Sequence, residues 1–225
     1  SEYWLATSIG SKRERDDANS KLNDDLIEFQ KTFPKSPFSA EALCQIGIHY
    51  EINEELDDAS KFYKEAVKRF PATSFGKRAA GSLVRLNSIG KPVRFAGETI
   101  TGKKFDLRDP GLRDKVVVIH FWESSRTSGL DEIARVVEKF KDDVVFVGCN
   151  IDKETDDFKA YMSKNRDVNW MQLHSPGSML ESPLAHQLGV PSEPWVMLFD
   201  KKGNLVESDV AFNDLERDIE RQRRK

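Results

Sequence analysis

The sequence is short of cysteine and of long apolar runs. Its 225 residues include only Cys44 and Cys149, too few for a disulfide framework. No apolar run approaches the roughly 20 residues that a membrane-spanning helix needs, and no basic cluster precedes the final Arg-Gln-Arg-Arg-Lys. We therefore expect no disulfide scaffold, no membrane insertion of the chain as given and no nucleic acid partner.

Motifs for metal binding and for serine hydrolysis are also missing. The histidines do not share a helix face with Cys, Asp or Glu at the spacing of metal ligands, and no Gly-x-Ser-x-Gly elbow occurs. The sequence therefore predicts no metal site and no other cofactor. The histidines are His49, His120, His174 and His186.

The composition is that of a well-solvated globular protein of two domains. Hydrophobic residues make up 38% of the chain, charged residues 32%, and the net charge is −3. Gly90 and Pro92 end a helical pattern, because glycine terminates a helix and proline prevents its continuation. We predict a helical domain over residues 1–90 and a second domain over 91–225.

The first domain contains a helical repeat pattern. One apolar stripe at helical spacing is formed by Leu22, Leu26, Phe29 and Phe33. A later set matches the tetratricopeptide pattern, in which small residues allow two helices to approach, aromatic residues fill the groove and a proline stops the second helix. The matching residues are Ile46, Gly47, Tyr50, Ala59, Tyr63, Ala66 and Pro71.

Only one full repeat fits, followed by a helix from about residue 74 to 88, whereas stand-alone arrays need about three repeats. Two interpretations of this region stay open. It is either a surface that binds a peptide or protein partner, or a helical spacer that packs on the second domain.

The second domain alternates strands and helices. Residues 93–107 suggest a hairpin that turns at Thr101-Gly102. The spacing of the apolar residues then changes from that of a strand to that of a helix across Ser124–Gly129, which predicts a strand, a sharp turn and a helix. The expected strands are 116–121, 143–150, 170–173, 195–200 and 204–207, and the expected helices are 133–140, 154–165, 178–188 and 212–222.

The strand, turn and helix around Ser124–Gly129 resemble the active-site region of the thioredoxin fold. They are most similar to that region in the bacterial TlpA/ResA-type thiol-disulfide oxidoreductases. In that family the strand ends Phe-Trp, as Phe121 and Trp122 do here, and leads into Trp-Cys-x-x-Cys. Glu132 also matches a family glutamate, whereas Ala134 replaces the family's helix proline. The resemblance implies a thioredoxin-like α/β domain, a central mixed sheet flanked by helices, over residues 91–225.

The four redox positions depart from the family, because they read Arg126-Thr127-Ser128-Gly129. Thiol-disulfide exchange needs one thiolate to attack and a second thiol to resolve the mixed disulfide, so dithiol chemistry is excluded at this turn. We therefore predict a redox-inactive binding or scaffolding protein. The alternative is an oxidoreductase or peroxide-handling enzyme that uses Cys149 or Cys44, which would require an exposed thiol of depressed pKa.

A second family marker is the loop that runs through Glu193 and Pro194 to the next strand. The resemblance implies that Pro194 is the cis-proline that faces the turn, and that the neighbouring backbone pairs with an extended substrate. Alternatively, Pro191 and Pro194 only shape the loop. The resemblance also implies a periplasmic or otherwise extracytoplasmic setting, although the chain begins at Ser1 and shows no export signal.

The predicted binding groove combines these two segments and recognises a protein or peptide partner. Trp122 is expected to offer an apolar platform, and Arg126 at the helix N-terminus to favour an acidic group, weakly because Glu193 is near. Thr127 and Ser128 are interpreted either as part of an anion site or as ordinary helix caps. The groove residues are Trp122, Arg126, Thr127, Ser128, Gly129, Glu193 and Pro194.

Overall fold

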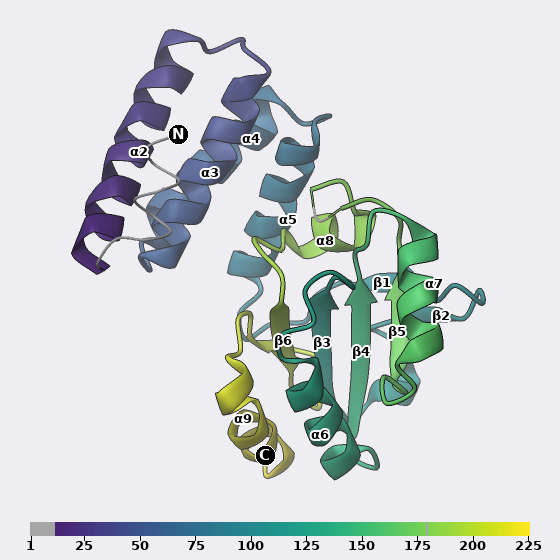
Figure 1. The fold of residues 1–225 in the computed structure, drawn as a ribbon. Helices are drawn as coiled ribbons and strands as arrows, with labels where there is room; N and C mark the ends of the chain where they lie inside the picture. The colour runs from purple at the N-terminus through teal and green to yellow at the C-terminus, as the bar shows by residue number, and fades with distance from the viewer. Residues whose placement is uncertain (1–11, 179) are drawn as a thin grey trace. The chain divides into compact units, whose positions relative to one another are not determined.

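The computed structural model describes residues 12–178 and 180–225, which form two compact units (Figure 1). The units divide between Leu83 and Val84, within helix α5 (Ser74–Asn87). The predicted boundary after residue 90 falls slightly later in the chain and stays a prediction. Each unit is considered separately below.

The first unit is all-α over its described residues. It contains α2 (Lys12–Thr32), α3 (Phe38–Ile52), α4 (Leu56–Arg69) and the start of α5. A Cβ atom on Gly47 would lie 2.4 Å from the Tyr63 ring, so only glycine allows α3 and α4 to come this close. The predicted small-residue contact is therefore present. Phe33 lies beyond the end of α2 and is exposed, unlike the rest of its predicted stripe.

The second unit is built on a mixed five-stranded sheet in the order β5-β4-β3-β6-β7. Strands β3 (Val116–Trp122), β4 (Val144–Asn150) and β5 (Met171–His174) are parallel, whereas β6 (Trp195–Phe199) and β7 (Leu205–Glu207) are antiparallel additions. The hairpin of β1 (Ala96–Glu98) and β2 (Lys104–Asp106) is separate from this sheet. Every residue of β3 is buried, as expected of a central strand.

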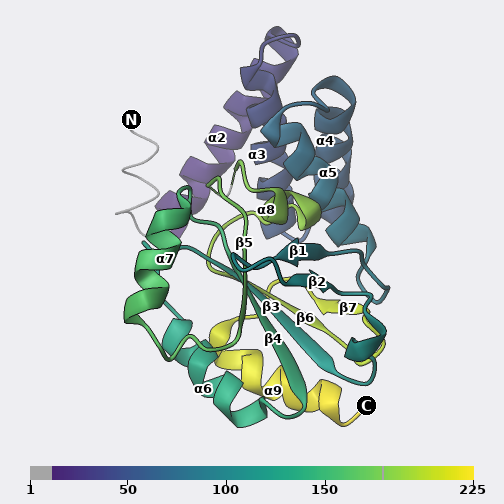
Figure 2. The ribbon, with the colours of Figure 1, turned by 90° about the vertical axis from the view of Figure 1, so that its right-hand side faces the viewer.

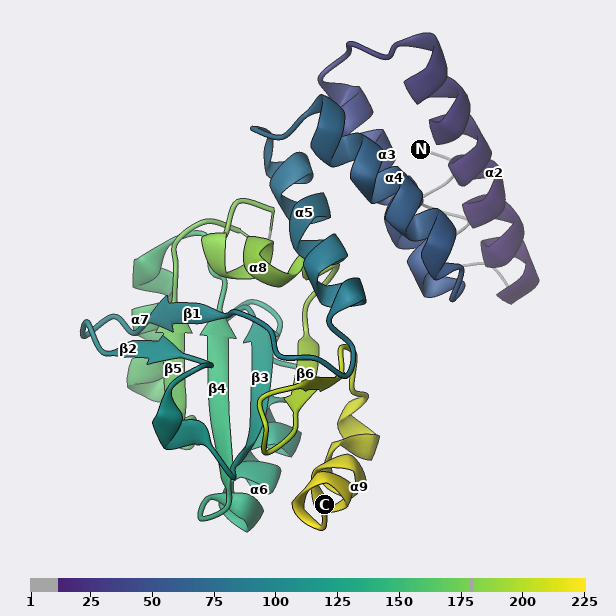
Figure 3. The same cartoon turned by 180° about the vertical axis from the view of Figure 1, so that it is seen from behind.

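The two faces of the sheet carry different covers, which Figure 2 and Figure 3 show from two sides. Helices α6 (Leu130–Phe140) and α9 (Phe212–Arg223) pack on one face through residues such as Ile133 and Ile219. The β1–β2 hairpin and α8 (Pro183–Leu188) close the other face. Helix α7 (Thr155–Lys164) contributes Phe158 to a smaller cluster around Trp122, and a short 3₁₀ turn covers Pro110–Leu112.

Most of the predicted elements are present, with one clear difference in length. The helix expected over 178–188 begins only at Pro183, because the Ser182 side chain caps it by accepting from the Ala185 N–H and proline fits the first helical position. In the described part of the chain, no helix is long and apolar enough to cross a membrane.

Candidate functional site

The candidate site begins where β3 ends and the chain turns into α6. Gly129 occupies the N-cap of α6 with φ 86°, and a Cβ there would lie 2.3 Å from the Phe212 ring. Glycine is needed twice over, for the left-handed backbone and for the contact with Phe212. The interpretation of Thr127 or Ser128 as the helix cap was wrong, since the N-cap residue is Gly129 and no side chain caps the helix there.

Trp122 does not form the apolar platform that the sequence suggested. Its side chain is fully buried. The indole N–H donates to Gln172 Oε1 at 3.0 Å, and the ring meets Phe158 and Tyr161 edge-on. The prediction of a platform was wrong because α7 covers this end of β3. Trp122 therefore packs in the interior below the turn and cannot touch a ligand.

A buried carboxylate fixes the shape of the turn. Asp152, just after β4, accepts hydrogen bonds from the Ser124 N–H at 2.7 Å, from the Ser124 hydroxyl and from Asn150 Nδ2 at 3.0 Å. Asn150 is bonded in turn to His174 Nδ1 at 2.9 Å, and His174 Nε2 to the Thr155 hydroxyl. This chain of bonds ties the turn to β4, β5 and α7, and sequence reasoning missed it because its members are far apart in the chain.

The turn and the proline loop meet through an ion pair. An Arg126 Nη1–H donates to Glu193 Oε1 at 2.8 Å. The Arg126 side chain is 66% exposed and the Glu193 side chain only 8%. The structure thus brings these two predicted site residues together, while Thr127 and Ser128 are exposed at the top of the turn. Because Arg126 already has a carboxylate partner, an acidic ligand would have to compete with Glu193.

The proline loop is held in place from behind by a residue that the sequence did not single out. The Glu193–Pro194 peptide bond is cis, as predicted. Arg85 on α5 is fully buried and donates to the carbonyl oxygens of Leu188 at 2.8 Å and Gly189 at 3.2 Å. Its guanidinium also lies 5.6 Å from the centre of the Trp195 ring. The sequence did contain a signal for this role, because Arg85 interrupts the otherwise apolar run 83–86, as a buried arginine would.

An open pocket of about 600 Å³ lies beside the turn. Its lining mixes carboxylates and lysines, so it has no strong preference for one charge. Glu123 at its edge has a raised pKa, first because of burial and then because of the negative charge of Glu193. The lining residues are Glu123, Ser124, Ser125, Asp152, Lys153, Asp157, Ala160, Tyr161, Lys164, Asn165 and Ser178.

Neither cysteine is placed for chemistry. Cys149 is fully buried on β4, and burial raises the pKa of its thiol well above the ordinary value. Burial likewise raises the pKa of Cys44 to about 11. Both thiols are therefore protonated at neutral pH and shielded from reagents. Over residues 12–178 and 180–225, no group of three or more His, Cys, Asp or Glu could hold a metal ion.

Comparison with known proteins defines the class of fold. No family model and no curated protein matches the chain. Among solved structures, it is similar to the C-terminal domain of a protein assigned as a thiol-disulfide oxidoreductase from Bacteroides thetaiotaomicron, with 21% identity, a TM-score of 0.54, and coverage of 60% of this chain and 96% of that chain. A thiol-disulfide oxidoreductase from Bacteroides fragilis is 17% identical with a TM-score of 0.51, over 57% of this chain and 96% of that one.

These similarities establish a thioredoxin-like fold for the sheet unit, preceded by an all-α region. At such identities they show the fold and nothing of the chemistry, so the activity has to be argued from the residues of this chain.

Proposed function

We propose that the thioredoxin-like unit is a redox-inactive module that binds a protein or peptide partner. The observation that supports the proposal concerns the turn after β3. This turn contacts the Glu193–Pro194 loop through a hydrogen bond, yet it contains no thiol. Without a nucleophilic sulfur, the two segments can still hold a chain but cannot exchange a disulfide with it.

The proposed binding surface consists of Arg126–Gly129 and the Glu193–Pro194 loop. Thr127 and Ser128 supply exposed hydroxyl groups, and Arg126 keeps most of its guanidinium in solvent. Since Arg126 and Glu193 neutralise each other, we expect the partner to be recognised through polar and main-chain hydrogen bonds, with weak selectivity for charge.

The alternative, an enzyme that uses an unusual thiol, finds less support. Cys149 and Cys44 would need to be exposed with a depressed pKa, and both are buried with a raised one. An oxidoreductase that relied on Cys149 would first have to open the sheet around β4.

For the first unit we propose a tetratricopeptide-like arrangement that serves as a spacer or as a second binding surface. The close contact of α3 and α4 at Gly47 and the buried Ala59 and Tyr63 support the comparison. We also propose an extracytoplasmic, periplasmic setting for the protein, which rests on the resemblance of the sheet unit alone.

The redox part of the proposal is tested by insulin reduction in the presence of dithiothreitol. The protein should add nothing to the reagent's own rate. If the protein reduces insulin faster than the reagent alone and the Cys149→Ser variant does not, the enzyme alternative is correct and the proposal of a redox-inactive module is wrong.

The binding part is tested by site-specific crosslinking in the full chain. A photo-crosslinking residue at exposed Ser128 should capture a partner from cell extract, whereas the same group at exposed Lys202, in the turn before β7, should not. Equal capture from both positions would mean that the turn is not the binding surface.

A further inference from the structure

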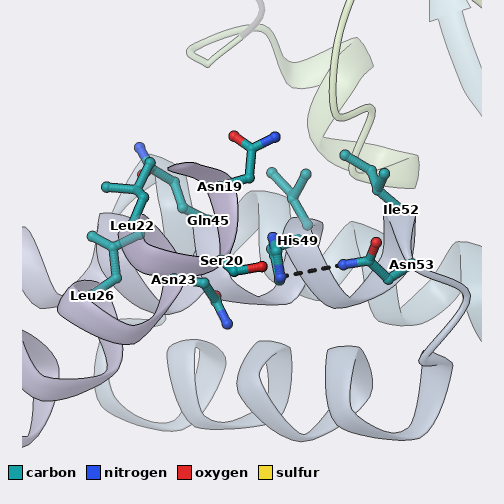
Figure 4. Close-up of a pocket in the computed structure, with 10 residues that line it drawn as sticks. Asn19, Ser20, Leu22, Asn23, Leu26, Gln45, His49, Ile52 and Asn53 are labelled. Atoms are coloured by element: carbon teal, nitrogen blue, oxygen red, sulfur yellow. Dashed lines mark hydrogen bonds between the residues drawn. The ribbon is translucent and has the colours of Figure 1, made fainter. Parts of the chain in front are cut away.

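A second pocket lies within the helical unit, between α2 and α3. Its volume is about 300 Å³, at the small end of ligand sites. Figure 4 shows the side chains from both helices that line it. The lining residues are Asn19, Ser20, Leu22, Asn23, Leu26, Gln45, Ile48, His49, Ile52 and Asn53.

The lining is unusual in its chemistry. It has four amide side chains, a hydroxyl and an imidazole, and four aliphatic side chains, but no Asp, Glu, Lys or Arg among its described residues. The contrast with the whole chain, of which 32% is charged, is large. Ile52 at the rim is 76% exposed, so an apolar surface stays open to solvent. A charged ligand would find no carboxylate, ammonium or guanidinium partner among the described lining residues, so we expect an uncharged ligand.

Asn23 gives the pocket an unused acceptor. The residue is only 6% exposed, and its carbonyl Oδ1 has no hydrogen-bond partner in the part of the chain that the structure describes. Buried polar groups in folded proteins are nearly always paired, so an unpaired one calls for an explanation. The other amides are differently placed: Asn53 Nδ2 bonds to His49 Nε2 at 3.2 Å, and Gln45 Nε2 donates to Glu41 at 3.0 Å.

We propose that this pocket binds an uncharged, extended polypeptide segment of a partner. The residue of that segment that enters the pocket donates its own backbone N–H to Asn23 Oδ1, and its aliphatic side chain lies against Leu22, Leu26 and Ile48. A peptide group fits because it offers a donor and an acceptor, as the lining amides do, and because it carries no charge. The volume admits about one residue and its flanking peptide groups rather than a large cofactor.

This inference rests on the binding alternative proposed for the helical unit. It is independent of the proposed function of the sheet unit, because every residue that it uses lies in the helical unit. It gives the second binding surface a location and a class of ligand.

The first test is an NMR titration of the full, isotopically labelled chain with the blocked peptide acetyl-Ala-Ala-Leu-Ala-Ala-amide. Signals from the Asn23 and Gln45 side-chain amides should shift in a saturable way. The same peptide with an N-methylated leucine lacks the donor and should bind about three- to tenfold more weakly, the range that one hydrogen bond contributes. Peptides with Lys or Asp in place of leucine should not compete.

Two results would overturn the proposal: no shift at the pocket residues at saturating peptide, or equal binding of the charged and the leucine peptides. A shift that is identical for the N-methylated peptide would remove Asn23 Oδ1 from the recognition.

The second test separates recognition from folding through Asn23→Leu, with Asn169→Leu as the matched control at an exposed site of the other unit. Asn23→Leu should lose peptide binding about three- to tenfold while its melting temperature stays level or rises, since an unpaired acceptor is replaced by an apolar group. A fall in melting temperature with unchanged binding would show that Asn23 has a structural role only. Asn169→Leu should leave binding unchanged.

Discussion

Asp152 in the sheet unit and Asn23 in the helical unit are both buried polar residues that line a pocket, but their surroundings differ. Asp152 accepts three hydrogen bonds from Ser124 and Asn150. Asn23 Oδ1 accepts none from the described residues. The first residue is saturated by its own fold and sets the shape of a turn. The second retains capacity for a group from outside.

The difference shows that burial alone does not identify a binding residue. His120 on β3 makes a third case, because it is buried and neither ring nitrogen has a partner within the described residues, yet it lines none of the pockets discussed above. Its imidazole meets the Phe212 ring edge-on and sits among apolar side chains of the α6 and α9 face. An unpaired group without an opening affects stability rather than binding.

The largest effect is expected where the hydrogen bonds are most numerous. Asp152→Ala should lower the free energy of unfolding by about 3 kcal/mol, because it leaves the Ser124 N–H and the Asn150 amide without an acceptor. Urea denaturation of the full chain measures this. Asp157→Ala, an exposed carboxylate of the same pocket, is the control and should change stability by less than about 0.5 kcal/mol. Equal losses in the two variants would mean that the hydrogen bonds of Asp152 do not stabilise the turn.

An intermediate effect is expected at His120 as the pH falls. Burial lowers the pKa of His120 from 6.5 to about 3, so between these values the unfolded chain binds a proton that the folded chain does not. Stability is therefore lost as the pH drops below about 6.5. The His120 contribution between pH 7.5 and 5 is about 2 kcal/mol. The His120→Leu variant should lack this part of the pH dependence, as measured by urea denaturation at both pH values. An unchanged pH dependence would mean that His120 is protonated or solvated in the folded state.

The smallest effect is expected at the ion pair between Arg126 and Glu193. Its arginine is largely exposed and screened by solvent, so Glu193→Gln should cost less than about 1 kcal/mol. Thermal unfolding at low and at high salt measures this, and the difference from the parent should shrink in salt. A loss of stability comparable to that of Asp152→Ala would mean that this ion pair, like the hydrogen bonds of Asp152, determines the shape of the turn.

Much of the fold could be predicted because apolar periodicity reports burial directly. Residues 116–121 and 133–140 define a buried strand and an amphipathic helix by pattern alone, and Pro194 was placed correctly by resemblance. The helix predicted over 178–188 is shorter in the structure, because the Ser182 side chain caps it and it begins only at Pro183.

The site was harder to predict because its contacts join residues that are distant in the sequence. Asp152 acts on Ser124 from another strand, and Arg85 acts on Leu188 across about a hundred positions. The pattern around Trp122 gave its place at the end of β3 but not its burial, because the cover comes from Phe158 and Tyr161 on α7. Spacing describes one element at a time, whereas a site is made where elements meet.

The outer strand β7 is only three residues long, and the chain before β1 runs along it. Leu205 donates its N–H to the Lys91 carbonyl at 3.0 Å and accepts from the Gly90 N–H at 2.8 Å. Further bridges join Ile89 to Leu205 and Pro92 to Asn204. These backbone groups are thus unavailable to a strand from another molecule, and Pro92 has no N–H to offer. The segment before β1 thus covers this edge of the sheet at Leu205, so another molecule cannot extend the sheet by pairing with that residue.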